Sequence, residues 1–175
     1  MPVTPIHLLH HPAHSSQDVD RVCFAIARAG SGAQLRIDLS GDISSLALPD
    51  GSGGARRDEL WQHTCFELFL RPDGADAYYE FNFAPNGDWA AYAFSAYRKD
   101  GRDLDSPAPI IRTEKTLETL SVFVHLPELP MREAARLGPS AVIESKTGGL
   151  SYWALHQPTD KPDFHAAENF KIKLD

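Results

Sequence analysis

The 175-residue sequence is poor in cysteine, methionine and positive charge. Two cysteines are too few for a disulfide framework, and both lie in apolar runs where buried, reduced thiols are expected. The two methionines, Met1 and Met131, give little support to haem ligation by a Met and a His. With 24 acidic and 17 basic residues, the net charge of -7 argues against general binding to nucleic acids or anionic membranes.

The sequence also lacks several segments and motifs that define other classes of protein. No apolar run is long enough to span a bilayer, and the N-terminal segment has neither the basic start nor the apolar centre of a secretion signal. We therefore expect a cytoplasmic protein. A G-x-S-x-G nucleophile elbow, a phosphate-binding loop before a helix and a dinucleotide fingerprint are all missing. We predict no cofactor.

Short apolar or alternating runs, separated by turn residues, predict a chain built almost entirely of β-strands. We expect strands over residues 6–9, 21–29, 34–40, 110–115, 119–126, 141–145, 150–156 and 170–174, with three more between Leu60 and Arg98. The one helical candidate is Pro127–Leu137, which Pro130 opens and Gly138-Pro139 ends. The sequence thus predicts a single domain over residues 1–175, an all-β, antiparallel β-sandwich of roughly ten strands with one short helix. A closed barrel is the architectural alternative.

The stretch from Leu60 to Arg98 is the centre of this prediction. Two turn signals, Pro72-Asp73-Gly74 and Pro85-Asn86-Gly87, divide it into three consecutive strands of a β-meander. Side chains alternate between the two faces of a sheet, so two sets of residues are predicted. The inward set is Phe66, Leu68, Leu70, Tyr79, Phe81, Phe83, Tyr92 and Phe94. The outward set is Cys65, Glu67, Phe69, Tyr78, Glu80, Asn82, Trp89, Ala91, Ala93, Ser95 and Tyr97.

An outward face with carboxylates, an amide and flat aromatic rings is typical of a platform for a small, carbohydrate-like ligand. Sugars present apolar CH faces and hydroxyl groups, so their binding requires aromatic surfaces and fixed hydrogen-bonding groups. Trp61 and Trp89, each at a strand start beside a loop, are the predicted stacking rings, whereas Trp153 is expected in the core. The candidate ligand-binding residues are Trp61, Glu67, Glu80, Asn82, Trp89, Tyr97, Arg98, Glu144, Tyr152 and His156.

Several alternatives remain open. Glu67 and Glu80 lie on neighbouring strands, and a pair of carboxylates could serve as acid and base in a small glycoside-acting enzyme. The same two residues could instead be ordinary outward side chains of a half-exposed sheet. His156 and His165 bracket a loop and could bind a metal or haem. An exposed sheet edge could also pair with another protein.

Two parts of the sequence resemble a known family. These are Leu60–Arg98, with its Cys65–Leu70, Tyr78–Phe83 and Pro85-Asn86-Gly87 runs, and Leu150–Phe170, with Ser151–His156 and Pro162–His165. They are similar to DOMON-like domains, in particular a bacterial cytoplasmic group, and to the related family 9 carbohydrate-binding modules. The resemblance implies a β-sandwich with a sugar- or haem-binding pocket on one sheet and no catalysis. The family 9 pattern places a sugar between two Trp rings, and Trp61 corresponds to one of them.

Overall fold

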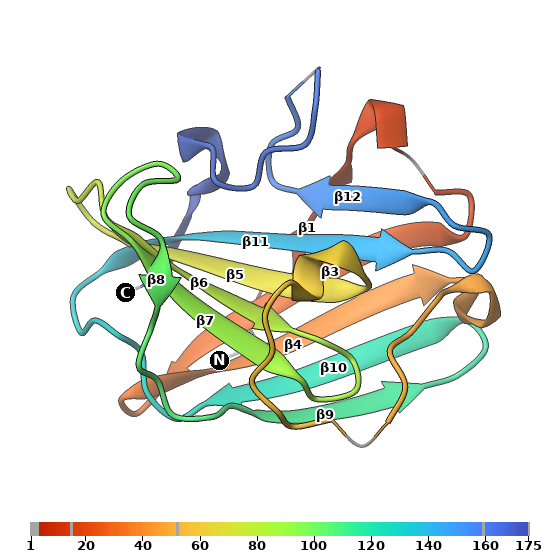
Figure 1. Ribbon diagram of the computed structural model, residues 1–175, viewed down its shortest axis with the longest axis horizontal. Coiled ribbons are helices and arrows are strands. Elements are labelled where there is room, and N and C mark those ends of the chain that lie inside the picture. Colours follow the sequence, from red (N-terminus) through yellow and green to blue (C-terminus); the bar gives the residue numbers. More distant parts are fainter. Residues whose placement is uncertain (1–3, 15, 52, 159, 175) are drawn as a thin grey trace.

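The chain folds into two antiparallel sheets packed face to face (Figure 1). The computed structural model describes residues 4–14, 16–51, 53–158 and 160–174. Short turns join several of the strands, as in β3–β4, β5–β6 and β6–β7, whereas longer connections lie between β4 and β5 and between β12 and β13. Within the described residues, no helix is long and apolar enough to cross a membrane.

The five-stranded sheet has the order β1-β3-β4-β10-β9. Its strands are β1 (Ile6–His7), β3 (Val19–Ala29), β4 (Gly32–Gly41), β9 (Ile110–Lys115) and β10 (Thr119–Leu126). The eight-stranded sheet has the order β2-β12-β11-β5-β6-β7-β8, and β13 also pairs with β11. Its strands are β2 (Leu9–His10), β5 (Cys65–Pro72), β6 (Tyr78–Phe83), β7 (Trp89–Phe94), β8 (Arg102–Asp103), β11 (Ala135–Glu144), β12 (Leu150–Ala154) and β13 (Ile172–Leu174). The antiparallel β-sandwich predicted from the sequence is therefore confirmed.

The main hydrophobic core lies between the two sheets. Phe24 of β3 meets Phe66 of β5 edge to face, with their ring centroids 6.4 Å apart, and both rings are fully buried. Trp153 of β12 belongs to the same core, as its alternation in the sequence predicts. Cys23 and Cys65 are buried free thiols.

A second, smaller hydrophobic cluster lies on the outer face of the eight-stranded sheet. Phe69 of β5 and Tyr78 of β6 point away from the main core, yet both are buried, because His165 and Phe170 pack against them. We call residues 160–170 the covering segment. It contains the three-residue 3-10 helix η4 (Ala167–Asn169), and it turns part of an outward face into enclosed space.

The helix predicted over Pro127–Leu137 is wrong, because Gly138 and Pro139, taken as its stop signal, lie in the middle of β11. Pro139 is tolerated there because one edge of β11 changes partner at this point, from β13 beside Ala135–Leu137 to β12 beside Ser140–Glu144. Gly138 leaves room for the covering segment, since an added Cβ would lie 3.1 Å from the backbone oxygen of Asn169. The helices of the described residues are 3-10 turns of three residues: η1 (Pro12–His14), η2 (Ile43–Ser45), η3 (Leu60–Gln62) and η4.

Candidate functional site

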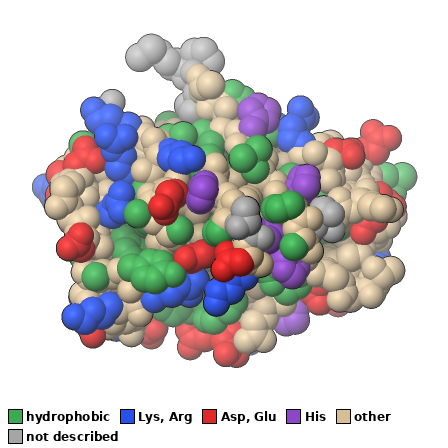
Figure 2. Space-filling view, turned by 90° about the horizontal axis from the view of Figure 1, so that it is seen from above, with side chains coloured by type: hydrophobic (Ala, Val, Ile, Leu, Met, Phe, Trp, Pro, Cys, Tyr) green, Lys and Arg blue, Asp and Glu red, His purple; other side chains and the backbone are tan. Residues whose placement is uncertain are grey.

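A cavity of about 460 Å³ lies on the outer face of the eight-stranded sheet, beside the covering segment. Its described lining residues are Trp61, Glu67, Glu80, Tyr92, Phe94, Arg98, Val142, Tyr152, Pro162, Phe164 and His165. Figure 2 looks down on the side of the molecule where the covering segment lies, and it shows acidic, basic and histidine side chains next to one another among hydrophobic ones. The cavity thus combines polar groups with apolar walls, as small-molecule sites commonly do.

Strand alternation places two carboxyl groups under this cavity. Glu67 of β5 and Glu80 of β6 both face away from the main core, and their side chains are almost entirely buried. Glu67 Oε2 accepts a hydrogen bond from Ser140 Oγ at 2.9 Å. Glu80 Oε1 accepts a hydrogen bond from Asn82 Nδ2 at 3.0 Å, so Asn82 fixes the position of the Glu80 carboxyl. The sequence predicts this shared face for Glu67 and Glu80, and the structure has it.

Burial makes both carboxyls reluctant to ionise. Loss of solvent, and then the neighbouring Glu80, raise the pKa of Glu67 to about 8. Loss of solvent also raises the pKa of Glu80, to about 7, against the opposing effect of the Asn82 hydrogen bond. Because two like charges so close together cannot both ionise freely, the pair holds at least one proton at neutral pH. The site therefore offers a hydroxyl donor as well as carboxyl acceptors.

A hydrogen-bonded chain fixes the far wall of the cavity. Tyr78 Oη accepts from the backbone N–H of Arg98 at 3.1 Å and lies 2.7 Å from His165 Nδ1. The Arg98 side chain donates through Nη2 to Asp163 Oδ1 at 2.8 Å. His165 Nε2 lies 3.8 Å from Glu80 Oε2. Burial, and then the charge of Arg98, lower the pKa of His165 to about 4, so this imidazole is neutral at ordinary pH.

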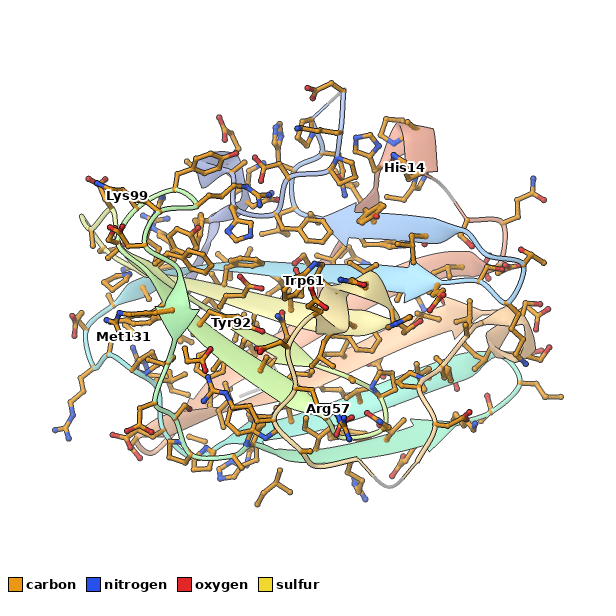
Figure 3. The ribbon with its side chains drawn as sticks, in the orientation of Figure 1. His14, Arg57, Trp61, Tyr92, Lys99 and Met131 are labelled. Carbon is orange, nitrogen blue, oxygen red and sulfur yellow. The ribbon has the colours of Figure 1, made fainter. Side chains whose placement is uncertain are left out.

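Aromatic rings form much of the remaining wall. Trp61 and Tyr92 meet edge to face at 6.2 Å, and Figure 3 shows both on the same side of the sheet. Phe94 stacks on Tyr78 at 4.8 Å and meets His165 edge to face at 5.2 Å. Trp61 is still 41% exposed, so its ring is available to a ligand at the mouth of the cavity.

Two residues beside the cavity have backbone conformations that side chains rarely adopt. Glu59, which precedes the η3 turn carrying Trp61, has a φ of 60°, and Arg98 has a φ of 50°. Left-handed conformations at residues other than glycine cost free energy and are often kept at functional sites. Here they turn the chain so that Trp61 and Arg98 both line the same space.

The structure brings five of the ten predicted ligand-binding residues together around the cavity. These are Trp61, Glu67, Glu80, Arg98 and Tyr152. Asn82 is not among the described lining residues, but it is fully buried and donates a hydrogen bond to Glu80.

The predicted face of β7 is reversed. Trp89 pairs with Phe83, and because paired residues of antiparallel strands share a face, Trp89 points into the main core with Phe83. It is 6% exposed, and Arg56 covers its ring at 5.1 Å. Tyr92 and Phe94, predicted to be core residues, point outward instead and line the cavity. The sequence signal that could have corrected this assignment is the turn of residues 84–88, because a turn of this length makes Phe83 and Trp89 paired residues on one face.

Three other predicted residues lie outside the described lining of the cavity. Tyr97 is 59% exposed and donates to Asp163 Oδ2 at 2.7 Å, so it supports the loop that carries Arg98. Glu144 Oε2 is bonded to His63 Nδ1 at 2.8 Å. The backbone N–H of His156 donates to Asn169 Oδ1 at 2.8 Å, which anchors the covering segment.

The two histidines considered for metal or haem binding are not gathered in the cavity. Of this pair, His165 lines it, and His156 is not among its described lining residues. Across residues 4–14, 16–51, 53–158 and 160–174, no group of three or more His, Cys, Asp and Glu side chains is arranged to hold a metal ion. Sequence reasoning named Phe164 only as part of the Pro162–His165 run and did not identify its place in the wall.

This fold and cavity define a β-sandwich with a ligand-sized hollow on one sheet, and solved structures share the fold. A protein from Bacteroides uniformis, provisionally described as carbohydrate-binding, has a TM-score of 0.66 at 14% identity, over 98% of this chain and 85% of its own. A family 9 carbohydrate-binding module from Caldicellulosiruptor kristjanssonii in complex with cellotriose has a TM-score of 0.60 at 8% identity, over 98% and 81%. A family 9 module of the same organism in complex with glucose has a TM-score of 0.54 at 8% identity, over 95% and 83%.

These likenesses, all at low identity, concern the fold. No protein-family model and no curated protein matches the chain.

Proposed function

We propose that this protein binds a carbohydrate-like small molecule, without catalysis, in the cavity on its eight-stranded sheet. The observation that carries the proposal is the composition of the cavity wall. Aromatic rings from η3, β7, β12 and the covering segment surround two buried carboxyls that can both donate and accept hydrogen bonds. A volume of about 460 Å³ lies within the range of pockets that enclose small organic ligands.

The chemistry of a sugar matches this wall. The CH face of a pyranose would stack on Trp61 or Tyr92, and its hydroxyls would bond to Glu67, Glu80 and Arg98. Solved structures of similar fold include one in complex with cellotriose and one in complex with glucose, which supports the choice of a sugar. In the family 9 pattern, the ring that encloses the sugar opposite Trp61 is a second Trp. Here Trp89 and Trp153 lie in the core, and Tyr92 packs edge to face against Trp61, so Phe94 takes that place.

Isothermal titration calorimetry with glucose, cellobiose and cellotriose tests the proposal. We expect at least one of these sugars to bind, and Trp61→Ala to weaken that binding roughly tenfold because the stacking surface is lost. Leu117→Ala is the matched control, since Leu117 is also an exposed apolar residue, on the β9–β10 hairpin of the other sheet. Absence of binding for the whole panel, or equal binding by the wild type and Trp61→Ala, would contradict this assignment.

One observation favours a second candidate, a glycoside-acting enzyme. A carboxyl whose pKa is raised to about 7 or 8 remains protonated at neutral pH and can act as a general acid, as Glu67 or Glu80 would. Incubation with aryl glycosides separates the two candidates. Release of the aryl group that is lost in both Glu67→Gln and Glu80→Gln would establish turnover, whereas binding of sugars without release supports the first.

A further inference from the structure

The described cavity wall contains more carboxyl groups than Arg and Lys side chains. Among its described lining residues, Arg98 is the one Arg or Lys, and its guanidinium is already paired with Asp163 at 2.8 Å. Glu67 and Glu80 have only neutral partners in hydrogen bonds, a serine hydroxyl and an asparagine amide. Among the described residues, neither carboxyl therefore has a cation in direct contact, although the charge of Arg98 lowers the pKa of both at longer range.

The walls around these carboxyls also suit a positive charge. Trp61, Tyr92, Phe94, Tyr152 and Phe164 line the same space. The face of an aromatic ring carries negative potential and attracts an ammonium group, most strongly where solvent is excluded. Aromatic rings together with unpaired carboxyls form a typical arrangement for recognising an amine, whereas a neutral sugar needs only the rings and hydrogen-bonding groups.

We propose that the cavity selects a carbohydrate-like ligand that carries a protonated amino group, an amino sugar, over the neutral sugar of the same shape. This inference rests on the proposed function, which places a sugar in the cavity. The ammonium group would lie between Glu67 and Glu80 and donate hydrogen bonds to both, while the pyranose ring stacks on the aromatic wall. An acidic sugar would be disfavoured by the same two carboxyls.

Binding of an ammonium group should release protons. In the free protein, burial raises the pKa of Glu67 to about 8 and that of Glu80 to about 7, so both carboxyls are mostly protonated at about pH 6. Each carboxyl that ionises beside the ligand passes its proton to solvent, and the amine keeps its own. The other groups facing the pair do not offset this: His165 is neutral, burial raises the pKa of the Cys65 thiol, and Arg98 stays paired with Asp163.

Calorimetry with glucose, glucosamine and N-acetylglucosamine at about pH 6, where an amine remains protonated, tests the inference. N-acetylglucosamine is the critical comparison, because it has nitrogen at the same position without the charge. We expect glucosamine to bind about tenfold more tightly than either neutral sugar. Repeating the titration in buffers of different ionisation enthalpy should show proton release with glucosamine and none with glucose.

Glu67→Gln keeps the shape and a hydrogen-bonding group but removes the charge. This variant should bind glucosamine no better than it binds glucose, so the ratio of the two affinities, measured on the same variant, is the readout. The control is Glu114→Gln, which alters an exposed carboxyl of β9 on the other sheet and should leave the preference intact. Equal affinity for glucose and glucosamine in the wild type, or a preference that survives Glu67→Gln, would overturn the inference and leave the proposed function standing. Failure of all three sugars to bind would overturn both.

Discussion

Replacing Glu67 by glutamine should make the stability of this protein less dependent on pH. In the wild type, burial and the neighbouring Glu80 raise the pKa of Glu67 from 4.5 to about 8. The folded protein therefore keeps a proton that the unfolded chain loses at lower pH. A carboxyl of this kind contributes its full stability below its unfolded pKa, and that contribution is lost as the pH rises towards its folded pKa.

The size of the effect follows from this difference in bound protons. One proton held only by the folded state changes the free energy of unfolding by about 1.4 kcal/mol per pH unit. His165 acts in the opposite direction, because burial lowers its pKa to about 4, so its contribution to stability grows as the pH rises from about 4 to about 6.5. The interval from about pH 6.5 to 8 is free of this opposition. Over it, Glu67 alone should lower the free energy of unfolding by about 2 kcal/mol.

Urea unfolding followed by tryptophan fluorescence, at both ends of this interval, measures the effect. The wild type should lose stability as the pH rises from about 6.5 to about 8. Glu80, whose pKa is about 7, should add to this loss in the lower part of the interval. Glu67→Gln should lose about 2 kcal/mol less, since its amide does not titrate. The control Glu114→Gln, with its carboxyl exposed on the other sheet, should follow the wild type. Identical pH dependence in the wild type and Glu67→Gln would show that Glu67 ionises normally and would refute the reasoning.

Two further predictions concern stability. Tyr78→Phe removes the hydroxyl bonded to the Arg98 backbone and to His165, and it should cost about 1–3 kcal/mol in urea unfolding; an unchanged midpoint would contradict the described network. Trp153→Ala opens a hole in the main core and should cost about 3–5 kcal/mol, whereas Trp61→Ala, at a ring that is 41% exposed, should cost less than about 1 kcal/mol. Equal losses in the two tryptophan variants would argue against their different placement.

Much of the fold was predictable because its determinants are local. The turns at Pro72-Asp73-Gly74 and Pro85-Asn86-Gly87 separate β5, β6 and β7 where the sequence predicts. Alternation within β5 and β6 assigns Glu67 and Glu80 to one face without reference to any other strand. These two assignments were sufficient to predict that Glu67 and Glu80 lie together in the wall of the cavity.

The errors arose where the pairing of one strand with another decides the outcome. Tyr92 and Phe94 fit a core pattern by composition, but the pairing of Trp89 with Phe83 sets their face, and composition does not reveal register. Gly138 and Pro139 are helix-ending residues in isolation. They are accommodated in β11 only because the partner strand changes from β13 to β12 beside Pro139, and both partners follow later in the chain.

The covering segment explains why one surface could be read as either a site or an ordinary solvated face. On the meander alone, Glu67 and Glu80 would face water, and their carboxylates would be the common outward residues of a half-exposed sheet. His165 and Phe170 pack against Phe69 and Tyr78, and Phe164 packs against Tyr152, so the segment encloses that face. Enclosure raises the pKa of both carboxyls and strengthens every interaction a ligand would make with them. The chemistry of the cavity therefore depends on residues about ninety positions away from the strands that supply its acids, a distance over which sequence periodicity carries no information.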